Sequence, residues 1–166
     1  MSNNQSLCLY PKVRSDFRRF LKSFQDGAGV FPDPIKIKVA HTYRVVREIR
    51  ALSLSPEGLH VSADIAQTAA ILHDIGRFQQ YAAFNSYDDR TTTDHAALSI
   101  VLIDQLGLLD EAGKEKKHQI RTAVRLHNSE SIEEGLDKAT CALVKMLRDA
   151  DKLDIWRVII SMDEDK

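Results

Sequence analysis

Histidine and aspartate side chains lie within apolar helical stripes of this chain, and this placement limits the folds it can adopt. Between residues 35 and 52, apolar side chains recur every third or fourth position, and His41 lies within that stripe. His73 and Asp74 end the apolar segment 62–75. Buried polar groups are costly unless they find partners. We therefore expect several helices to bring these groups, together with Asp151, into one interior site.

Helical periodicity continues along the rest of the chain, and no stretch alternates with the period of two that marks a β-strand. We predict helices over residues 15–24, 35–52, 62–75, 79–84, 94–106, 112–127 and 138–160, joined by turns and polar loops. Gly76 is expected to end the third of these helices in the left-handed conformation. The predicted fold class is all-α: a compact bundle of about six or seven helices, in a single domain over residues 1–166.

Composition argues against several classes of protein. Hydrophobic residues make up 43% and charged residues 28%, and a net charge of -1 gives no overall attraction to nucleic acid or anionic membrane. Cys8 and Cys141 form no CxxC pair and are interpreted as reduced thiols. The sequence has no recognisable secretory signal and no apolar run long enough to span a bilayer. We expect a cytoplasmic protein with no membrane and no nucleic-acid partner.

The last helical segment is strongly apolar close to the end of the chain. Ile155, Val158, Ile159 and Ile160 precede the polar residues 163–166. Two interpretations stay open. Either the chain is truncated at its C-terminus, or this apolar helix packs against a partner subunit in a homo-oligomer.

Six side chains form a set of metal ligands in chain order: His41, His73, Asp74, His95, His127 and Asp151. Imidazole nitrogen and carboxylate oxygen bind divalent transition metals such as Mn, Fe, Co, Ni or Zn. Six groups exceed what one ion needs and suffice for two ions that share a bridge. Asp74 is the natural bridge, because a carboxylate has two oxygens. Such a set points to a hydrolase that uses metal-activated water.

Several strings of the sequence resemble the HD superfamily of metal-dependent phosphohydrolases: HTYRV from His41, AILHDIGR from Ala70 and RDADKLD from Arg148. The resemblance runs from about residue 38 to residue 155 and is supported by DHA around His95 and LHN around His127. It implies that His41, His73, Asp74 and Asp151 are the core metal ligands. It also implies that His95 and His127 match the additional histidines of the two-metal branches.

Neighbouring residues compete for some of these roles. Asp149 is expected to face solvent, and Asp154 to support a nearby lysine or arginine, which leaves Asp151 as the ligand. His60 and His118 lie in polar surroundings and are expected to be solvated.

Basic and amide side chains close to the ligands are candidates for substrate binding: Arg44, Arg77, Arg125 and Asn128. Arg77 is expected to be exposed beside the metals and, with Asp74 and Lys152, to take part in catalysis. A surface ion pair is the alternative for each basic residue. The loop around residues 85–90 is either a lid or a plain connector.

The favoured function is hydrolysis of a phosphate ester, as a phosphomonoesterase or phosphodiesterase, with one or two divalent transition-metal ions as cofactor. The resemblance alone implies the substrate class, a nucleotide or another small phosphorylated metabolite. A catalytically weak regulatory HD domain that binds a nucleotide or metal is the alternative. An oxygen-activating di-iron enzyme on the same scaffold is a more distant one.

Overall fold

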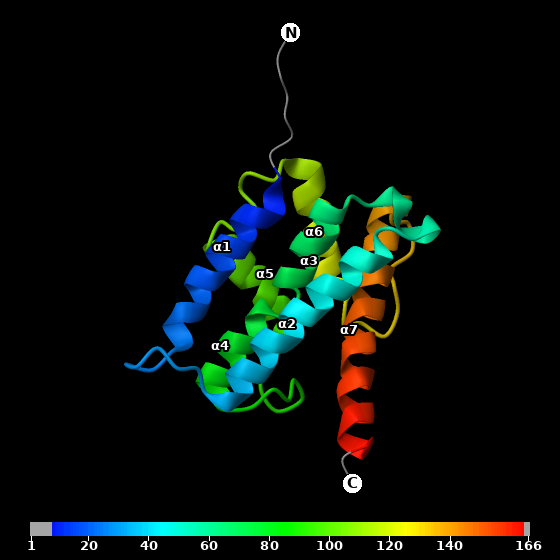
Figure 1. The fold of residues 1–166 in the computed structure, drawn as a ribbon. Helices are drawn as coiled ribbons and strands as arrows, with labels where there is room; N and C mark the ends of the chain where they lie inside the picture. Colours follow the sequence, from blue (N-terminus) through cyan, green and yellow to red (C-terminus); the bar gives the residue numbers. More distant parts are fainter. Residues whose placement is uncertain (1–7, 165–166) are drawn as a thin grey trace.

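The computed structural model describes residues 8–164, and within them the only regular structure is helical (Figure 1). The prediction of an all-α fold is confirmed. The elements in chain order are α1 (Leu9–Leu21), η1 (Lys22–Phe24), α2 (Asp33–Leu52), η2 (Pro56–His60), α3 (Ala63–Leu72), α4 (Ile75–Phe84), α5 (His95–Gln105), α6 (Lys114–Leu126) and α7 (Lys138–Glu164). Among the described residues, no helix has the combination of length and apolar character needed to cross a membrane.

The central helix of the bundle is α3, which packs against α1, α2, α6 and α7. Most of its side chains are small or aliphatic, and Ala66, Ala69, Ala70, Ile71 and Leu72 are fully buried. Small side chains allow close approach of neighbouring helices on several sides. A polar group at the end of such a helix therefore lies inside the bundle, within reach of the helices that surround it.

The predicted helix over residues 62–75 is interrupted. α3 ends at Leu72, a turn at His73 and Asp74 follows, and α4 begins at Ile75. Gly76 therefore lies in the first turn of α4, and the prediction that it ends a helix in the left-handed conformation is wrong. Its role is packing. A Cβ at Gly76 would lie 2.4 Å from the carbonyl oxygen of His95 and 2.7 Å from the amide nitrogen of Ser99, so glycine lets α4 approach α5 closely.

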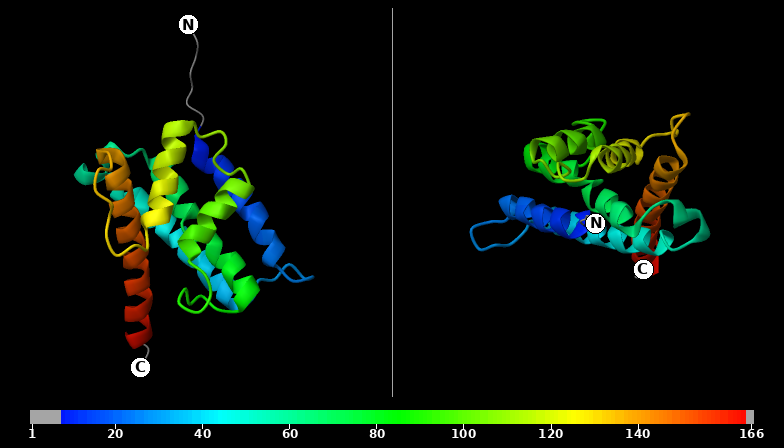
Figure 2. Two further views of the ribbon diagram at one scale, coloured as in Figure 1. Left: turned by 180° about the vertical axis from the view of Figure 1, so that it is seen from behind. Right: turned by 90° about the horizontal axis from the view of Figure 1, so that it is seen from above.

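The helices α2 and α7 run in opposite directions and pack against each other. The amino end of α2 and the carboxyl end of α7 lie at the same end of the molecule, at the bottom of Figure 1 and again in Figure 2, left. Beyond Asp151, α7 presents Leu153, Ile155, Trp156 and Ile160 to solvent, with exposed fractions of 44–66%. The contact with a partner subunit through this helix stays a prediction.

Candidate metal centre

The six side chains predicted to be metal ligands meet at one interior site. They come from five different parts of the chain: α2 (His41), the turn between α3 and α4 (His73, Asp74), the first residue of α5 (His95), the residue after α6 (His127) and α7 (Asp151). The four histidines and Asp74 are at most 6% exposed. The side chain of Asp151 is 19% exposed and lies at the edge of the site.

Asp74 lies between two groups of ligands. Its Oδ2 is 3.4 Å from His73 Nε2 and 3.6 Å from His41 Nε2. Its Oδ1 is 3.3 Å from His95 Nε2 and 3.7 Å from His127 Nε2. Within each group the ligand atoms lie within 4.8 Å of one another, a spacing at which they could hold one ion. Each oxygen of this carboxylate thus faces one pair of histidines.

Asp151 adds a second carboxylate to the group that contains His41 and His73. Its Oδ1 is 3.0 Å from His41 Nε2 and 3.6 Å from His73 Nε2. This group therefore offers two imidazoles and two carboxylates. The other group offers His95, His127 and the shared Asp74. The Nε2 atoms of His95 and His127 are 3.0 Å apart.

The second nitrogen of each histidine makes a hydrogen bond that fixes the direction of the ring. Nδ1 donates to Asp154 Oδ2 (2.8 Å) in His41, to the carbonyl of Ala70 (2.7 Å) in His73, to Asp89 Oδ2 (2.6 Å) in His95 and to the carbonyl of Val124 (2.7 Å) in His127. Because these acceptors are oxygens, Nδ1 carries the proton. The Nε2 atoms then point into the site, where a ring that gives up its Nε2 proton can offer a lone pair to a metal ion.

Local sequence explains why three of these histidines are so placed. His73 and His127 each occupy the C-cap position of a helix, where the carbonyl three residues earlier has lost its helical partner and accepts from the ring. Asp94 caps α5 through hydrogen bonds from the amides of Ala96 and Ala97. This cap makes His95 the first residue of α5 and directs it toward the site.

The residues fit a bound divalent transition metal. The Nε2 atoms of His41 and His73 are buried and make no hydrogen bond, although buried polar atoms normally do. Both face carboxylate oxygens. Buried nitrogen atoms that make no hydrogen bond and lie among carboxylates are what a metal ion requires of its protein ligands. The donor set accepts any of several divalent ions, so the metal's identity is left open.

Burial and charge shift the pKa values of these groups in opposite directions. Burial works to raise the pKa of Asp74, but Lys38 and His73 outweigh it and hold that pKa well below the usual range. For Asp151, His41 and His73 likewise outweigh burial and lower the pKa. Burial works to lower the pKa of His73, yet Asp74 and Asp151 raise it to about 10. Burial dominates at His95 and lowers its pKa to about 4, so this ring is neutral at neutral pH.

Sequence reasoning missed Lys38, whose Nζ lies 2.5 Å from Asp74 Oδ2. Lys38 precedes His41 by three residues on α2, so the two side chains share a face of the helix. This three-residue spacing is the sequence feature that could have identified Lys38 as a neighbour of the site. The ammonium nitrogen donates a hydrogen bond to Asp74 Oδ2, the carboxylate oxygen that also faces His41 and His73.

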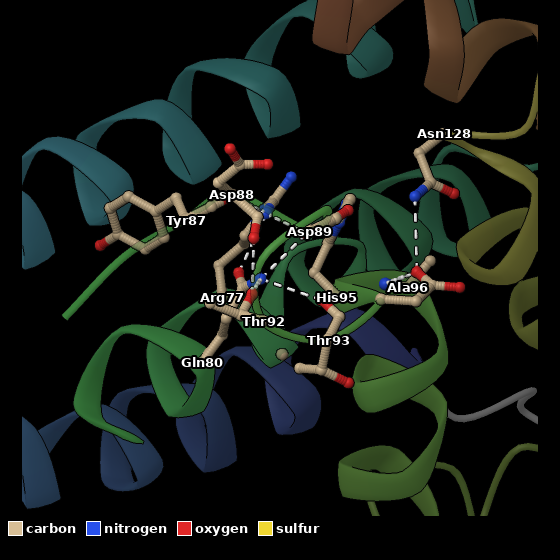
Figure 3. Close-up of polar contacts among 12 residues, drawn as sticks. Arg77, Gln80, Tyr87, Asp88, Asp89, Thr92, Thr93, His95, Ala96 and Asn128 are labelled. Atoms are coloured by element: carbon tan, nitrogen blue, oxygen red, sulfur yellow. Dashed lines mark hydrogen bonds and ion pairs between the residues drawn. The ribbon is translucent and has the colours of Figure 1, made fainter. Parts of the chain in front are cut away.

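Sequence reasoning also missed Asp89 and Gln80, which Figure 3 shows beside Arg77 and His95. One oxygen of Asp89 accepts from His95, and the other accepts from Arg77 Nη1 (2.5 Å) and Gln80 Nε2 (2.9 Å). Gln80 is fully buried. The loop after α4, which the sequence allows to be either a lid or a connector, supplies a carboxylate that orients a predicted metal ligand. Its position between two site elements was the only hint of this role.

The expectation that Arg77 is exposed is wrong. Its side chain is 16% exposed, because the loop after α4 folds over it. Nη1 donates to Gln80 Oε1 (2.9 Å), to the carbonyl of Tyr87 (2.5 Å) and to Asp89 Oδ1 (2.5 Å). Its Nε is 3.8 Å from Asp74 Oδ1, beside the centre. A substrate role for Arg77 stays a prediction, but the arginine also holds the loop in place.

The other predicted substrate and catalytic residues lie in different settings. Arg44 makes two hydrogen bonds, of 2.6 and 3.0 Å, to Asp154. Asp154 thus pairs with an arginine, as predicted, and it also accepts a hydrogen bond from His41. Arg125 pairs with Glu133 on the surface, and Lys152 is exposed on α7. Asn128 is exposed and lies 3.5 Å from Asp94. The substrate roles of Arg44, Arg125 and Asn128 and the catalytic role of Lys152 stay predictions. As expected, Asp149, His60 and His118 are exposed.

Comparison with known proteins agrees with this geometry. The family model described as the HD domain matches residues 39–156. The chain is similar to the protein named "Putative phosphohydrolase YueE" of Bacillus subtilis (strain 168), with 32% identity over 138 residues that cover 75% of this chain and 73% of the relative. The comparison with solved structures gave no match. On the extent of the family match and of this relative, the chain belongs to the HD domain family.

Proposed function

We propose that this protein is a metal-dependent phosphohydrolase that cleaves a phosphate ester of a nucleotide or another small phosphorylated metabolite. The observation that carries the proposal is the position of Asp74, whose two oxygens face two separate pairs of imidazole nitrogens. The name of the B. subtilis relative, "Putative phosphohydrolase YueE", supports the same reaction class.

In the proposed reaction, water adds its oxygen to phosphorus, the phosphorus–oxygen ester bond breaks, and the alcohol leaves with a proton. A bound divalent metal supplies Lewis acidity that activates the water and polarises a phosphoryl oxygen. His41, His73, Asp74 and Asp151 would hold one ion. His95 and His127 would hold a second ion together with Asp74.

The chain's own cations would handle the charge of the phosphate. Arg77 and Lys38 reach the two oxygens of Asp74 from different sides, at 3.8 and 2.5 Å. A phosphoryl group bound beside Asp74 would therefore lie within reach of a guanidinium and an ammonium group. Such donors stabilise charge that develops in the transition state. Lys152, which follows the ligand Asp151 directly, is proposed as a third basic group at the edge of the site.

The test is a phosphate-release screen on protein stripped with a chelator and reloaded separately with Mn, Fe, Co, Ni or Zn. The panel should contain nucleoside monophosphates, sugar phosphates, aryl phosphates and phosphodiesters, which separates monoesterase from diesterase activity. Asp151→Ala should lower the rate by about 100-fold or more, the scale of losing a key electrostatic contact. Asp149→Ala is the matched control, because Asp149 is an exposed aspartate on the same helix.

Release of phosphate that depends on metal, is lost in Asp151→Ala and is retained in Asp149→Ala would support the proposal. Saturable binding of a nucleotide without turnover, with every metal tried, would contradict it. That second result would favour the regulatory HD domain instead.

A further inference from the structure

A small hollow lies beside the metal centre, between the amino end of α2 and the carboxyl end of α7. Its volume is about 230 Å³, and its lining residues are Ile37, Lys38, His41, Arg44, Tyr87, Asp154, Ile155 and Val158. His41 belongs both to this lining and to the metal centre. The hollow therefore opens next to the position where the phosphate of a substrate would be bound.

Helical spacing places apolar side chains in the hollow one turn away from metal ligands on both helices. On α2, Ile37 precedes His41 by four residues, and on α7, Ile155 follows Asp151 by four residues. Residues four apart share a helix face. Ile37 is 65% exposed and Ile155 is 44% exposed, so both present apolar surface to solvent at the edge of a polar site.

The polar groups around the hollow are already paired within the protein. The hydroxyl of Tyr87 donates to the carbonyl of Pro34 at 3.1 Å, which leaves its ring to form part of the wall. Arg44 and Asp154 bind each other through two hydrogen bonds. Lys38 pairs with Asp74, and its Nζ lies 5.9 Å from the centroid of the Tyr87 ring. A ligand group in the hollow therefore meets apolar surface and few uncommitted hydrogen-bonding atoms.

We propose that this hollow binds the organic group of the substrate, and that the substrate is a phosphate ester of a small apolar alcohol or phenol. This inference rests on the proposed phosphohydrolase function and narrows its substrate class to small phosphorylated metabolites other than nucleotides and sugar phosphates. A strongly polar group, such as a sugar, would lose hydrogen bonds to water on entering the hollow and would regain few. A flat or short apolar group would gain burial against Ile37, Ile155 and Tyr87. The modest volume selects small groups.

The test compares the binding of phenylphosphonate and methylphosphonate, which cannot be hydrolysed, to metal-loaded protein by calorimetry. Phenylphosphonate should bind about tenfold more tightly, as expected for burial of its ring. Ile155→Asn and Ile37→Asn should each remove most of that preference and leave methylphosphonate binding within about twofold of wild type. Ile160→Asn is the matched control, because Ile160 is a 57% exposed isoleucine of α7 that does not line the hollow.

The outcomes separate this inference from the proposed function. Equal affinity for the two phosphonates, or a preference that survives in both Ile155→Asn and Ile37→Asn, overturns the assignment of the hollow. Loss of the preference in Ile160→Asn as well also overturns it. A preference that depends on Ile155 and Ile37, without hydrolysis of any phosphate ester, upholds the hollow and overturns the enzymatic function. Failure of both phosphonates to bind also overturns the assignment of the hollow, whereas the phosphate-release screen decides the enzymatic function by itself.

Discussion

The ammonium group of Lys38 lies 2.5 Å from Oδ2 of Asp74, the oxygen that also faces His41 and His73. Lys38 therefore neutralises the carboxylate that the metal centre shares. A metal ion that binds to His41 and His73 must displace the Lys38 ammonium group from Oδ2 of Asp74. Lys38 is thus expected to stabilise the Asp74 carboxylate when no metal is bound and to weaken metal binding.

Lys38→Met should tighten metal binding by about tenfold, because the competing ammonium group is gone. The same change should lower the free energy of unfolding of the metal-free protein by about 1–3 kcal/mol, since Asp74 loses a charged hydrogen-bond partner. Metal titration and chemical denaturation measure the two effects. Lys36→Met is the control, because Lys36 is on the same helix and pairs with the exposed Asp33. Weaker metal binding in Lys38→Met would contradict competition.

Metal binding should release protons at neutral pH. Burial works to lower the pKa of His73, but Asp74 and Asp151 raise it to about 10 in the metal-free protein, so the ring is protonated on Nε2. A metal ion has to displace that proton. Affinity should therefore rise with pH, by up to about tenfold per unit between pH 6 and 9. Calorimetry in buffers with different ionisation enthalpies counts the protons, and zero protons released would contradict this account.

The metal-free protein should also lose stability as pH rises. The folded pKa of His73 exceeds its unfolded value of about 6.5, so its contribution is fully present below pH 6.5 and lost as pH approaches 10. The lowered pKa values of Asp74 and Asp151 contribute above about pH 4 and are lost in acid. His95 acts in the opposite sense, because burial lowers its pKa to about 4, so its contribution is present above about pH 6.5 and is lost as pH falls toward 4. With chelator present, the thermal midpoint should therefore be highest near about pH 6.5. A midpoint that increases steadily from pH 6 to pH 9 would disagree.

Asp89→Asn should weaken binding of the second metal by about 10- to 100-fold, because Asp89 orients His95 and raises the basicity of its ring. It should also loosen Arg77 and Gln80, which share the same carboxylate. Metal titration resolves the weaker site. Asp88→Asn is the matched control, since the Asp88 carboxylate makes its hydrogen bonds to the exposed Arg90 and not to His95. Equal effects of the two substitutions would mean that the loop matters as a whole and that Asp89 has no particular role.

Gly76→Ala should destabilise the protein by about 1–3 kcal/mol, although alanine is the better helix former. The added Cβ would lie 2.4 Å from the carbonyl oxygen of His95, so α4 and α5 must move apart at the metal centre. Gly27→Ala is the control, because nothing lies within 4 Å of its Cβ position. Chemical denaturation of both variants tests this. A Gly76→Ala variant as stable as the Gly27→Ala variant would show that the helices yield at little cost.

The helices and the approximate membership of the site could be predicted from sequence, because both depend on local spacing. The stripe around His41 and the His73-Asp74 pair at the end of an apolar segment identify side chains that must converge. The Asp94 cap predicts the start of α5. These features involve residues at most a few positions apart, and helical geometry relates such positions directly.

The environment of those residues could not be predicted in the same way. Arg77 looked exposed because nothing in its own helix covers it, whereas the loop that buries it lies about ten residues further along the chain. Gly76 looked like a helix end because the clash that requires glycine involves the backbone of α5. The contact between Asp154 and His41 spans 113 positions. Such relationships depend on tertiary packing, which periodicity does not encode.

The most direct test of the account is the metal content of Asp74→Asn, measured by mass spectrometry after reloading and buffer exchange, with wild type and Asp149→Asn treated in parallel. Because the two oxygens of Asp74 face both groups of histidines, the substitution should weaken both positions together. We expect two metal ions per chain in wild type and in Asp149→Asn, and fewer than one in Asp74→Asn. Retention of the full wild-type metal content in Asp74→Asn would contradict the central claim that this carboxylate joins the two halves of the centre.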